Sequence, residues 1–388
     1  MSFLIMSNRR IWRSNAANNK PDEIHSPFIQ DYIERRDRQR DFRSWTSDRG
    51  ENGHPSMWSK NLTWGNRGRP IPEVHVQFQD AAPDGEGGYY FTVNFGVVGG
   101  LFHHNAQGEE RRLFHRERFR CDGLAYQPAG KRFAAAFGAE DGTTHICLLD
   151  ENGREVRWLT EGDSNDAFPA WDPSRPGTIL YQASGLAHRP EGWAEYGAWE
   201  AMELNLEKGE LSTLWRRDGM DVLLPRRDAR GNLYALIRPS GDAPVPWWET
   251  ARRVALVPWV FVQGVFGFAN AFTSMFAQKP LWRAGGPPGK VDSAPAIRVL
   301  GKRLETRVLE ENGKVPVERR YLAPASWQLW RRDLEGVESM VADHVSWFAL
   351  SPDGTPYYTT GLAIHALKNE EIEIVYRGSL IESFMPLL

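Results

Sequence analysis

Short apolar stretches that break at a turn and resume at once recur along the chain. Four of them are residues 124–135, 169–181, 223–235 and 348–358. Proline, aspartate and glycine recur at the breaks, where they supply the fixed or positive φ of a tight turn. The flanking positions are rich in β-branched and aromatic residues, which suit a pleated strand. The pattern therefore predicts repeated β-hairpins.

A second turn follows each hairpin at a regular distance. These turns are residues 104–108, 149–153, 205–209 and 332–336, with a weaker copy at 367–371. Two hairpins per repeat give four strands, and stacked four-stranded repeats are typical of a β-propeller. We predict an all-β fold, a propeller of about five, possibly six, blades.

Two of the repeats carry a recognisable motif. Trp171-Asp172-Pro173 and the Ser-Pro-Asp-Gly turn of residues 351–354 resemble the TolB-like, PD40 (WD40-like) propeller repeat. The resemblance covers residues 73–388 apart from an insertion. Residues 225–228 depart from it because they lack the aromatic, and residues 74–80 match loosely. The resemblance implies the fold but no activity, since propellers serve as scaffolds, receptors and enzymes.

Composition agrees with one large β domain. The 388 residues are 41% hydrophobic and include 16 Trp, 36 Gly and 25 Pro, which suit many short strands and tight turns. Cys121 and Cys147 fall on expected strands, and we expect buried free thiols, as in a reducing cytoplasm. Residues 1–6 hold too few apolar positions before Arg9 to predict an export signal.

Repeat spacing locates an insertion inside one blade. Gly209 and Gly336 are too far apart for a single blade, and the excess lies at residues 240–325. We expect residues 232–238 and 326–330 to be the second and third strands of the interrupted blade. The chain then divides into an extended basic N-terminal arm, 1–72, and a propeller, 73–388, interrupted by the inserted element.

The inserted element begins with an uncharged run at residues 254–277, long enough to span a membrane. A simple span is excluded, because both ends return to one blade. If this run is helical, its polar and small residues form one narrow stripe and its apolar residues cover the rest of the helix surface. Such a wide apolar face predicts docking to a membrane or an integral membrane protein. A buried helix that caps the propeller is the alternative. The predicted docking residues are Trp247, Trp248, Arg252, Arg253, Trp259, Phe261, Phe266, Phe268, Phe272, Phe276, Lys279 and Trp282.

The rest of the insertion, residues 298–322, is expected to form a polar hairpin that turns at 311–314. Residues 250–325 hold twelve basic and five acidic residues, which gives a net charge of +7. Residues 1–70 hold thirteen basic and eight acidic residues, which gives +5. The net charge of the whole chain is −3. Basic segments beside an apolar one favour an anionic membrane surface. Ordinary solvated charge is the alternative for the N-terminal part.

The N-terminal arm combines a disorder-like composition with spaced aromatics. We expect it to be a strap that orders on a partner's surface or on its own propeller, with a short helix at residues 27–35. Its predicted anchors are Trp12, Phe28, Tyr32, Trp45, Trp58 and Trp64.

Catalytic signals are weak. Aspartates recur near the starts of the first strands, at Asp122, Asp166, Asp221 and Asp343. Paired carboxylates could serve a glycosidase. Aspartates at this repeat position more often accept hydrogen bonds from turn amides. The His103-His104 pair has no ligand cluster beside it, and no phosphate loop or nucleophile elbow is found. We therefore predict no catalytic, metal or cofactor-binding residue, and nucleic acid is not an expected partner.

These features together predict a non-enzymatic accessory or scaffold subunit. Its propeller would be a cytoplasmic platform for protein–protein interaction, docked peripherally on a membrane or an integral membrane protein complex through the inserted segment. The alternative is a glycosidase-like propeller hydrolase that uses axial carboxylates.

Overall fold

The computed structural model describes most of the chain. The described residues are 2–7, 10–15, 18–48, 76–96, 98–188, 194–241, 296–300, 302–305, 321–368, 371–378 and 380–387. The segment 254–277 and the twelve predicted docking residues lie outside these ranges, as do Trp58 and Trp64.

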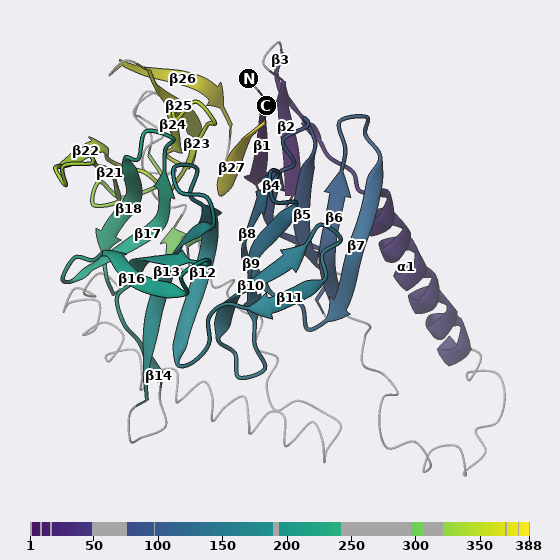
Figure 1. Cartoon of the computed structure of the whole chain (residues 1–388). Helices are drawn as coiled ribbons and strands as arrows, with labels where there is room; N and C mark the ends of the chain where they lie inside the picture. The colour runs from purple at the N-terminus through teal and green to yellow at the C-terminus, as the bar shows by residue number, and fades with distance from the viewer. Residues whose placement is uncertain are drawn as a thin grey trace, which may run out of the picture.

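Within the described residues, the strands form six four-stranded antiparallel units, here called A to F (Figure 1). Units C and D share one sheet through a single parallel pairing of Thr144 with Asn165. Unit A contains β1 (Ser2–Ser7), β2 (Arg10–Asn15), β3 (Asn18–Glu23) and β27 (Ser383–Leu387); unit B contains β4 (Gln77–Pro83), β5 (Tyr89–Asn94), β6 (Val98–His104) and β7 (Glu110–Glu117); unit C contains β8 (Cys121–Gln127), β9 (Arg132–Gly138), β10 (Thr144–Asp150) and β11 (Glu155–Trp158).

The remaining units follow the same order along the chain. Unit D contains β12 (Ser164–Trp171), β13 (Thr178–His188), β15 (Glu200–Asn205) and β16 (Glu210–Trp215), with β14 (Ala194–Tyr196) paired to the end of β13; unit E contains β17 (Met220–Arg227), β18 (Leu233–Pro239), β21 (Gln328–Arg332) and β22 (Glu338–Ala342); unit F contains β23 (Trp347–Leu350), β24 (Pro356–Thr359), β25 (Ala363–Lys368) and β26 (Glu371–Arg377).

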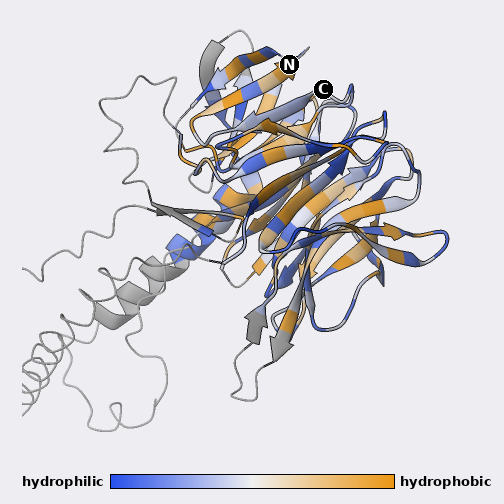
Figure 2. Cartoon of the chain, turned by 90° about the vertical axis from the view of Figure 1, so that its left-hand side faces the viewer, coloured by the Kyte–Doolittle hydropathy of each residue, from blue (hydrophilic) through white to orange (hydrophobic). Residues whose placement is uncertain are grey.

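The six innermost strands contact one another in a closed ring. The contacts run from β27 to β4, β8, β12, β17 and β23 and back to β27. Alternating apolar positions face the neighbouring unit, so the hydrophobic core lies between the sheets, as the orange positions along the strands indicate in Figure 2. This arrangement is an all-β propeller, as the repeats predicted.

Unit A joins the two ends of the chain. Strand β1 pairs with β27, with Phe3 opposite Pro386 and Ile5 opposite Phe384. Residues 3–6 are all buried, which suits a strand covered on both faces. Strands β1, β2 and β3 are therefore part of a sheet, which differs from the extended arm expected for residues 1–72. The difference arises because their partner strand lies at the other end of the sequence.

Helix α1 (Pro27–Asp48) follows unit A and extends away from the sheets (Figure 1). Ser26 caps it by accepting a hydrogen bond from the Ile29 amide at 3.2 Å. The Glu110 carboxylate accepts hydrogen bonds from the Ser26 hydroxyl, 2.8 Å, and the Phe28 amide, 3.3 Å. The short helix expected at residues 27–35 is thus present and longer.

The insertion leaves unit E between its second and third strands. Strand β18 pairs with β21, with Leu236 opposite Leu329, as the spacing predicted. The described part of the insertion is a hairpin of β19 (Ala296–Val299) and β20 (Lys302–Glu305). This hairpin turns between Val299 and Lys302, whereas the turn expected at 311–314 lies outside the described residues. Among the described residues, no helix is long and apolar enough to cross a membrane.

Candidate functional site: the axial cavity

The innermost strands enclose a cavity of about 480 Å³ on the axis of the ring. All six units contribute to its lining, including Asp80, Leu124, Trp171, Arg226 and Phe348. Its volume lies within the ~300–1,000 Å³ range of small-molecule sites. The lining is mainly apolar and aromatic, with a few charged groups, so the cavity combines the two features that such sites share.

The cavity opens where the innermost strands end. Pro83, Pro128, Pro173 and Pro352 line it there and are exposed to solvent. Proline has a fixed φ and no N–H to donate, so these four residues make a stiff rim with few hydrogen-bond donors. We call this side of the propeller the rim face.

At the opposite side of the ring, aromatic side chains of different units pack together. Phe168 of β12 and Trp347 of β23 meet edge to face, and Trp347 donates an indole hydrogen bond to the Phe384 carbonyl of β27, 3.1 Å. Residues at the starts of β8, β12 and β17 do not line the cavity. The cavity is therefore a pocket reached from the rim face.

Irregular pairing in the innermost strands sets which side chains reach the cavity. The register between β17 and β18 shifts between Leu223 and Arg226, and Leu224 has φ of 52°. A bulge of this kind re-aims the residues beside it. The Leu224 amide donates to the Gln182 side chain of unit D, 2.9 Å, and Arg226 lines the cavity.

Arg226 is held by backbone carbonyls. Its Nη1 donates to the Phe168 carbonyl, 3.0 Å, and to the Pro225 carbonyl, 2.9 Å. Among the described residues, no carboxylate forms an ion pair with this guanidinium. Burial lowers the pKa of Arg226 to about 10, an effect that Asp80 opposes in part. Arg226 is thus a half-buried cation beside an apolar cavity, and burial disfavours its charged form.

Asp80 faces the same cavity from unit B. Its Oδ2 accepts a hydrogen bond from the Leu124 amide, 2.7 Å, and its Oδ1 accepts one from the Ala81 amide, 2.9 Å. Burial raises the pKa of Asp80 to about 6, although the two amides and the Arg226 charge lower it. Because both oxygens bond to amides, this carboxylate also ties unit B to unit C.

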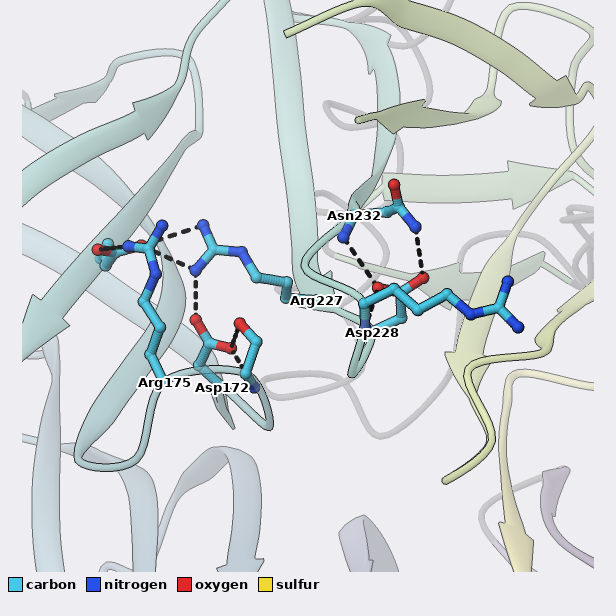
Figure 3. A network of polar contacts seen from close by, with 8 residues as sticks. Asp172, Arg175, Arg227, Asp228 and Asn232 are labelled. Atoms are coloured by element: carbon cyan, nitrogen blue, oxygen red, sulfur yellow. Dashed lines mark hydrogen bonds and ion pairs between the residues drawn. The ribbon is translucent and has the colours of Figure 1, made fainter. Parts of the chain in front are cut away.

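A buried ion-pair network fixes the rim between units D and E (Figure 3). Arg227 bonds to Asp172 and, at 3.1 Å, to Glu203, and Glu203 also accepts from Arg175, 2.7 Å. Asp228 accepts three hydrogen bonds within its own turn, from the Arg230 amide and from the amide and side chain of Asn232. The side chains of Arg227 and Asp228 thus have hydrogen-bond partners within the protein. Within the described part of the chain, Arg226 is the charged lining residue that keeps N–H groups without a partner.

The aspartates singled out in the sequence lie elsewhere. Asp166 accepts from the Ser164 hydroxyl, 3.1 Å, Asp221 pairs with Arg238, 3.1 Å, and Asp122 pairs with Arg120, 2.5 Å. Asp343 is exposed, and none of the four lines the cavity. They lie at or just before the starts of innermost strands, away from the rim.

Sequence reasoning missed Asp80 and Arg226. Asp80 lies in the loosely matched first repeat, and Arg226 lies in residues 225–228, the segment noted for departing from the repeat. That departure was the available signal. His103 bonds to Asp84, 2.9 Å, and stacks on Tyr90, and the described residues contain no group of three or more His, Cys, Asp or Glu placed to hold a metal ion.

The aromatic anchors of the N-terminal segment pack on the chain's own sheets where the structure describes them. Trp12 of β2 packs on the core of units E and F, and Phe28 and Tyr32 of α1 contact Phe95, with ring centroids 6.1 and 4.8 Å apart. Trp45 belongs to α1.

Comparison with known proteins reveals similarity in structure only. No family model matches the sequence, and no curated protein matches it significantly. TolB from Acinetobacter baumannii superposes with a TM-score of 0.50 over 99% of this chain and 65% of that chain, at 8% identity. The chain has a TolB-like β-propeller fold.

Two further solved structures show weaker similarity. A putative TolB from Agrobacterium tumefaciens has a TM-score of 0.44 at 12% identity, over 81% of this chain and 87% of that chain. The tricorn protease has a TM-score of 0.46 at 13% identity, over 96% of this chain and 33% of that chain. At 8% identity the A. baumannii structure shows the fold alone, and the chain spans just under two thirds of that protein.

Proposed function

We propose that this protein is a non-enzymatic accessory subunit. Its propeller is a platform for protein–protein interaction that attaches peripherally to a membrane, or to an integral membrane protein complex, through the insertion. The described geometry around the insertion supports this proposal.

The described base of the insertion and the rim lie at opposite ends of the strands of unit E. Strand β18 ends beside the start of β17, with Asp221 opposite Arg238, whereas the rim follows the end of β17 at residues 228–229. An attachment made through the insertion therefore leaves the cavity accessible from the other side. This separation is the observation on which the proposal rests.

The base of the insertion is firmly anchored. Arg238, 2% exposed, pairs with Asp221 and donates from Nη2 to the Leu300 carbonyl at the turn of the β19–β20 hairpin, 2.8 Å. Lys302 donates to the Pro239 carbonyl, 2.6 Å. A force applied to the insertion would thus be transmitted to unit E, as an attachment element requires.

The chemistry of the insertion suits an anionic membrane surface. Residues 254–277 carry no charge, and the net charge of +7 over residues 250–325 contrasts with −3 for the whole chain. Each basic residue near an anionic leaflet contributes about 1 kcal/mol of attraction, and burial of the aromatic residues adds to it.

The hydrolase alternative finds less support. A glycosidase of this kind needs two carboxyl groups ~5–10 Å apart that face the substrate. Asp80 and Asp228 line the cavity, but amide hydrogen bonds occupy both Asp80 oxygens and Asp228 caps its own turn. Both therefore have structural roles.

Replacement of residues 243–289 by a short Gly/Ser linker tests the proposal. The ladder between β18 and β21 stays closable at small loop-entropy cost, so the variant should fold and lose its binding to anionic vesicles or to a membrane fraction. The milder variant Phe266→Asp/Phe272→Asp should also fold and lose its membrane binding, because the new charges would have to be desolvated on docking. If both variants unfold while the native protein stays monomeric without detergent, the segment is a core element and the proposal fails.

A further inference from the structure

We infer that the axial cavity binds an organic anion, a carboxylate attached to an apolar or aromatic group, with Arg226 as its anchor. This inference concerns the rim face and does not depend on membrane attachment. The ligand class follows from the donors that Arg226 leaves unused, from the lining and from the shape of the cavity.

The free edge of Arg226 fits a carboxylate. Two backbone carbonyls occupy Nη1, and the structure gives Nε and Nη2 no hydrogen-bond partner within the described residues. The N–H groups on these two nitrogens point in parallel along one edge of the guanidinium, the arrangement that bonds both oxygens of a carboxylate. Because Nη1 is fixed, the orientation of this edge is set before any ligand arrives.

The charge balance around Arg226 also points to an anion. A desolvated cation is costly unless it is paired. The carboxylate whose charge raises the pKa of Arg226 is Asp80, and its oxygens bond to the Leu124 and Ala81 amides rather than to the guanidinium. The other lining arginine, Arg227, is already neutralised by Asp172 and Glu203. Arg226 is thus the lining cation that an incoming anion would meet.

The rest of the cavity suits an apolar body. Tyr126, Trp171, Phe348 and the rim prolines present aromatic and aliphatic surface with few donors. Trp171 uses its indole N–H on the Ala125 carbonyl, 3.3 Å, and Arg132 lies over its ring, 4.6 Å, so its orientation is fixed. A sugar or another ligand with many hydroxyl groups would leave most of its polar groups unpaired here, which disfavours it.

Isothermal titration calorimetry on the full chain tests the inference with paired probes. 4-Phenylbutyrate and its amide have the same shape and differ in charge, and the peptide Gly-Gly-Leu-Phe is compared with its C-terminally amidated form. We expect the acid to bind at least about tenfold more tightly than its amide, the factor given by hydrogen bonds to a charged group. Whether the free acid or the peptide binds more tightly distinguishes a small-molecule ligand from the end of a chain.

Variants then assign the effect to Arg226. Arg226→Gln should remove the preference for the acid, whereas Arg331→Gln, an exposed arginine on β21, should retain it. Equal affinity for acid and amide, no binding of either acid at millimolar concentration, or an unchanged preference in a folded Arg226→Gln variant would overturn the inference. The acid–amide comparison on the native protein decides the matter even if Arg226→Gln does not fold.

Discussion

Phe168 and Trp347 meet across the ring with their centroids 5.5 Å apart, although their strands, β12 and β23, are separated by β17. Phe168 adopts φ of 52°, a left-handed conformation that is unfavourable for a side chain with Cβ. The contact thus joins two non-adjacent units at the cost of local backbone strain, and Trp347 also lines the cavity.

This strain predicts an unusual order of stability. Both Phe168→Ala and Phe168→Gly lose the aromatic contact, but glycine accepts the positive φ, so we expect the glycine variant to be more stable by about 1 kcal/mol. Urea denaturation of both variants measures the difference. The matched pair is Phe133→Ala and Phe133→Gly at a buried β9 position without positive φ, where alanine should be the more stable. The same order at both sites would refute the role of strain.

Asp80 should make stability depend on pH. Its folded-state pKa, about 6, lies above its ordinary value of 3.8, so the folded protein binds this proton more tightly than the unfolded chain. Its contribution is therefore fully present below about pH 4 and is lost as the pH rises through 6, by about 3 kcal/mol. We expect the native protein to lose stability relative to Asp80→Asn as the pH rises from about 4 to about 7. The measurement is the unfolding free energy of both proteins over this range.

The control for Asp80 is Glu86→Gln, a change at an exposed carboxylate on the next turn. Its difference from the native protein should stay flat over the same pH range. A flat difference for Asp80→Asn as well would mean that this carboxyl is not desolvated by folding.

The Arg238–Asp221 pair should be expensive to break. Both side chains are at most 5% exposed, so Arg238→Met leaves a buried carboxylate without its partner, and we expect a loss of ~3–5 kcal/mol in unfolding free energy. The double variant Arg238→Met/Asp221→Asn should lose less than Arg238→Met alone, because no charge stays buried. Arg216→Met, which breaks an exposed pair with Glu200, should cost at most ~1 kcal/mol. Similar losses for Arg238→Met and Arg216→Met would contradict the burial argument.

Closure of the ring by β27 predicts sensitivity at the C-terminus. Phe384 is 3% exposed and contacts Phe3 at 5.9 Å between centroids, so Phe384→Ala should cost ~3–5 kcal/mol. Ile372→Ala, on the outer strand β26 and 56% exposed, should change stability by no more than ~0.5 kcal/mol. Thermal unfolding of the two variants checks this, and a Phe384→Ala midpoint close to that of native protein would exclude β27 as the closing strand.

Local sequence determined much of this architecture. The Pro, Asp and Gly turns and the alternating apolar residues predicted four-stranded repeats, because strands and hairpin turns depend on nearby residues. The strands expected on either side of the insertion correspond to β18 and β21, which pair with each other. Local sequence also predicted the start of α1 at Pro27 but not its end at Asp48, since a charged stretch carries no apolar period to follow.

Only the tertiary structure decided which distant segments meet. The pairing of β1 with β27 joins residues 2–6 to residues 383–387, and no local pattern encodes a partner so remote. The four recurring aspartates occupy one repeat position and yet lie away from the cavity, because the starts of the innermost strands are at the end of the ring opposite the rim. Arg226 and Asp80 come from units E and B and acquire their shared cavity, their burial and their shifted pKa values only when the ring closes.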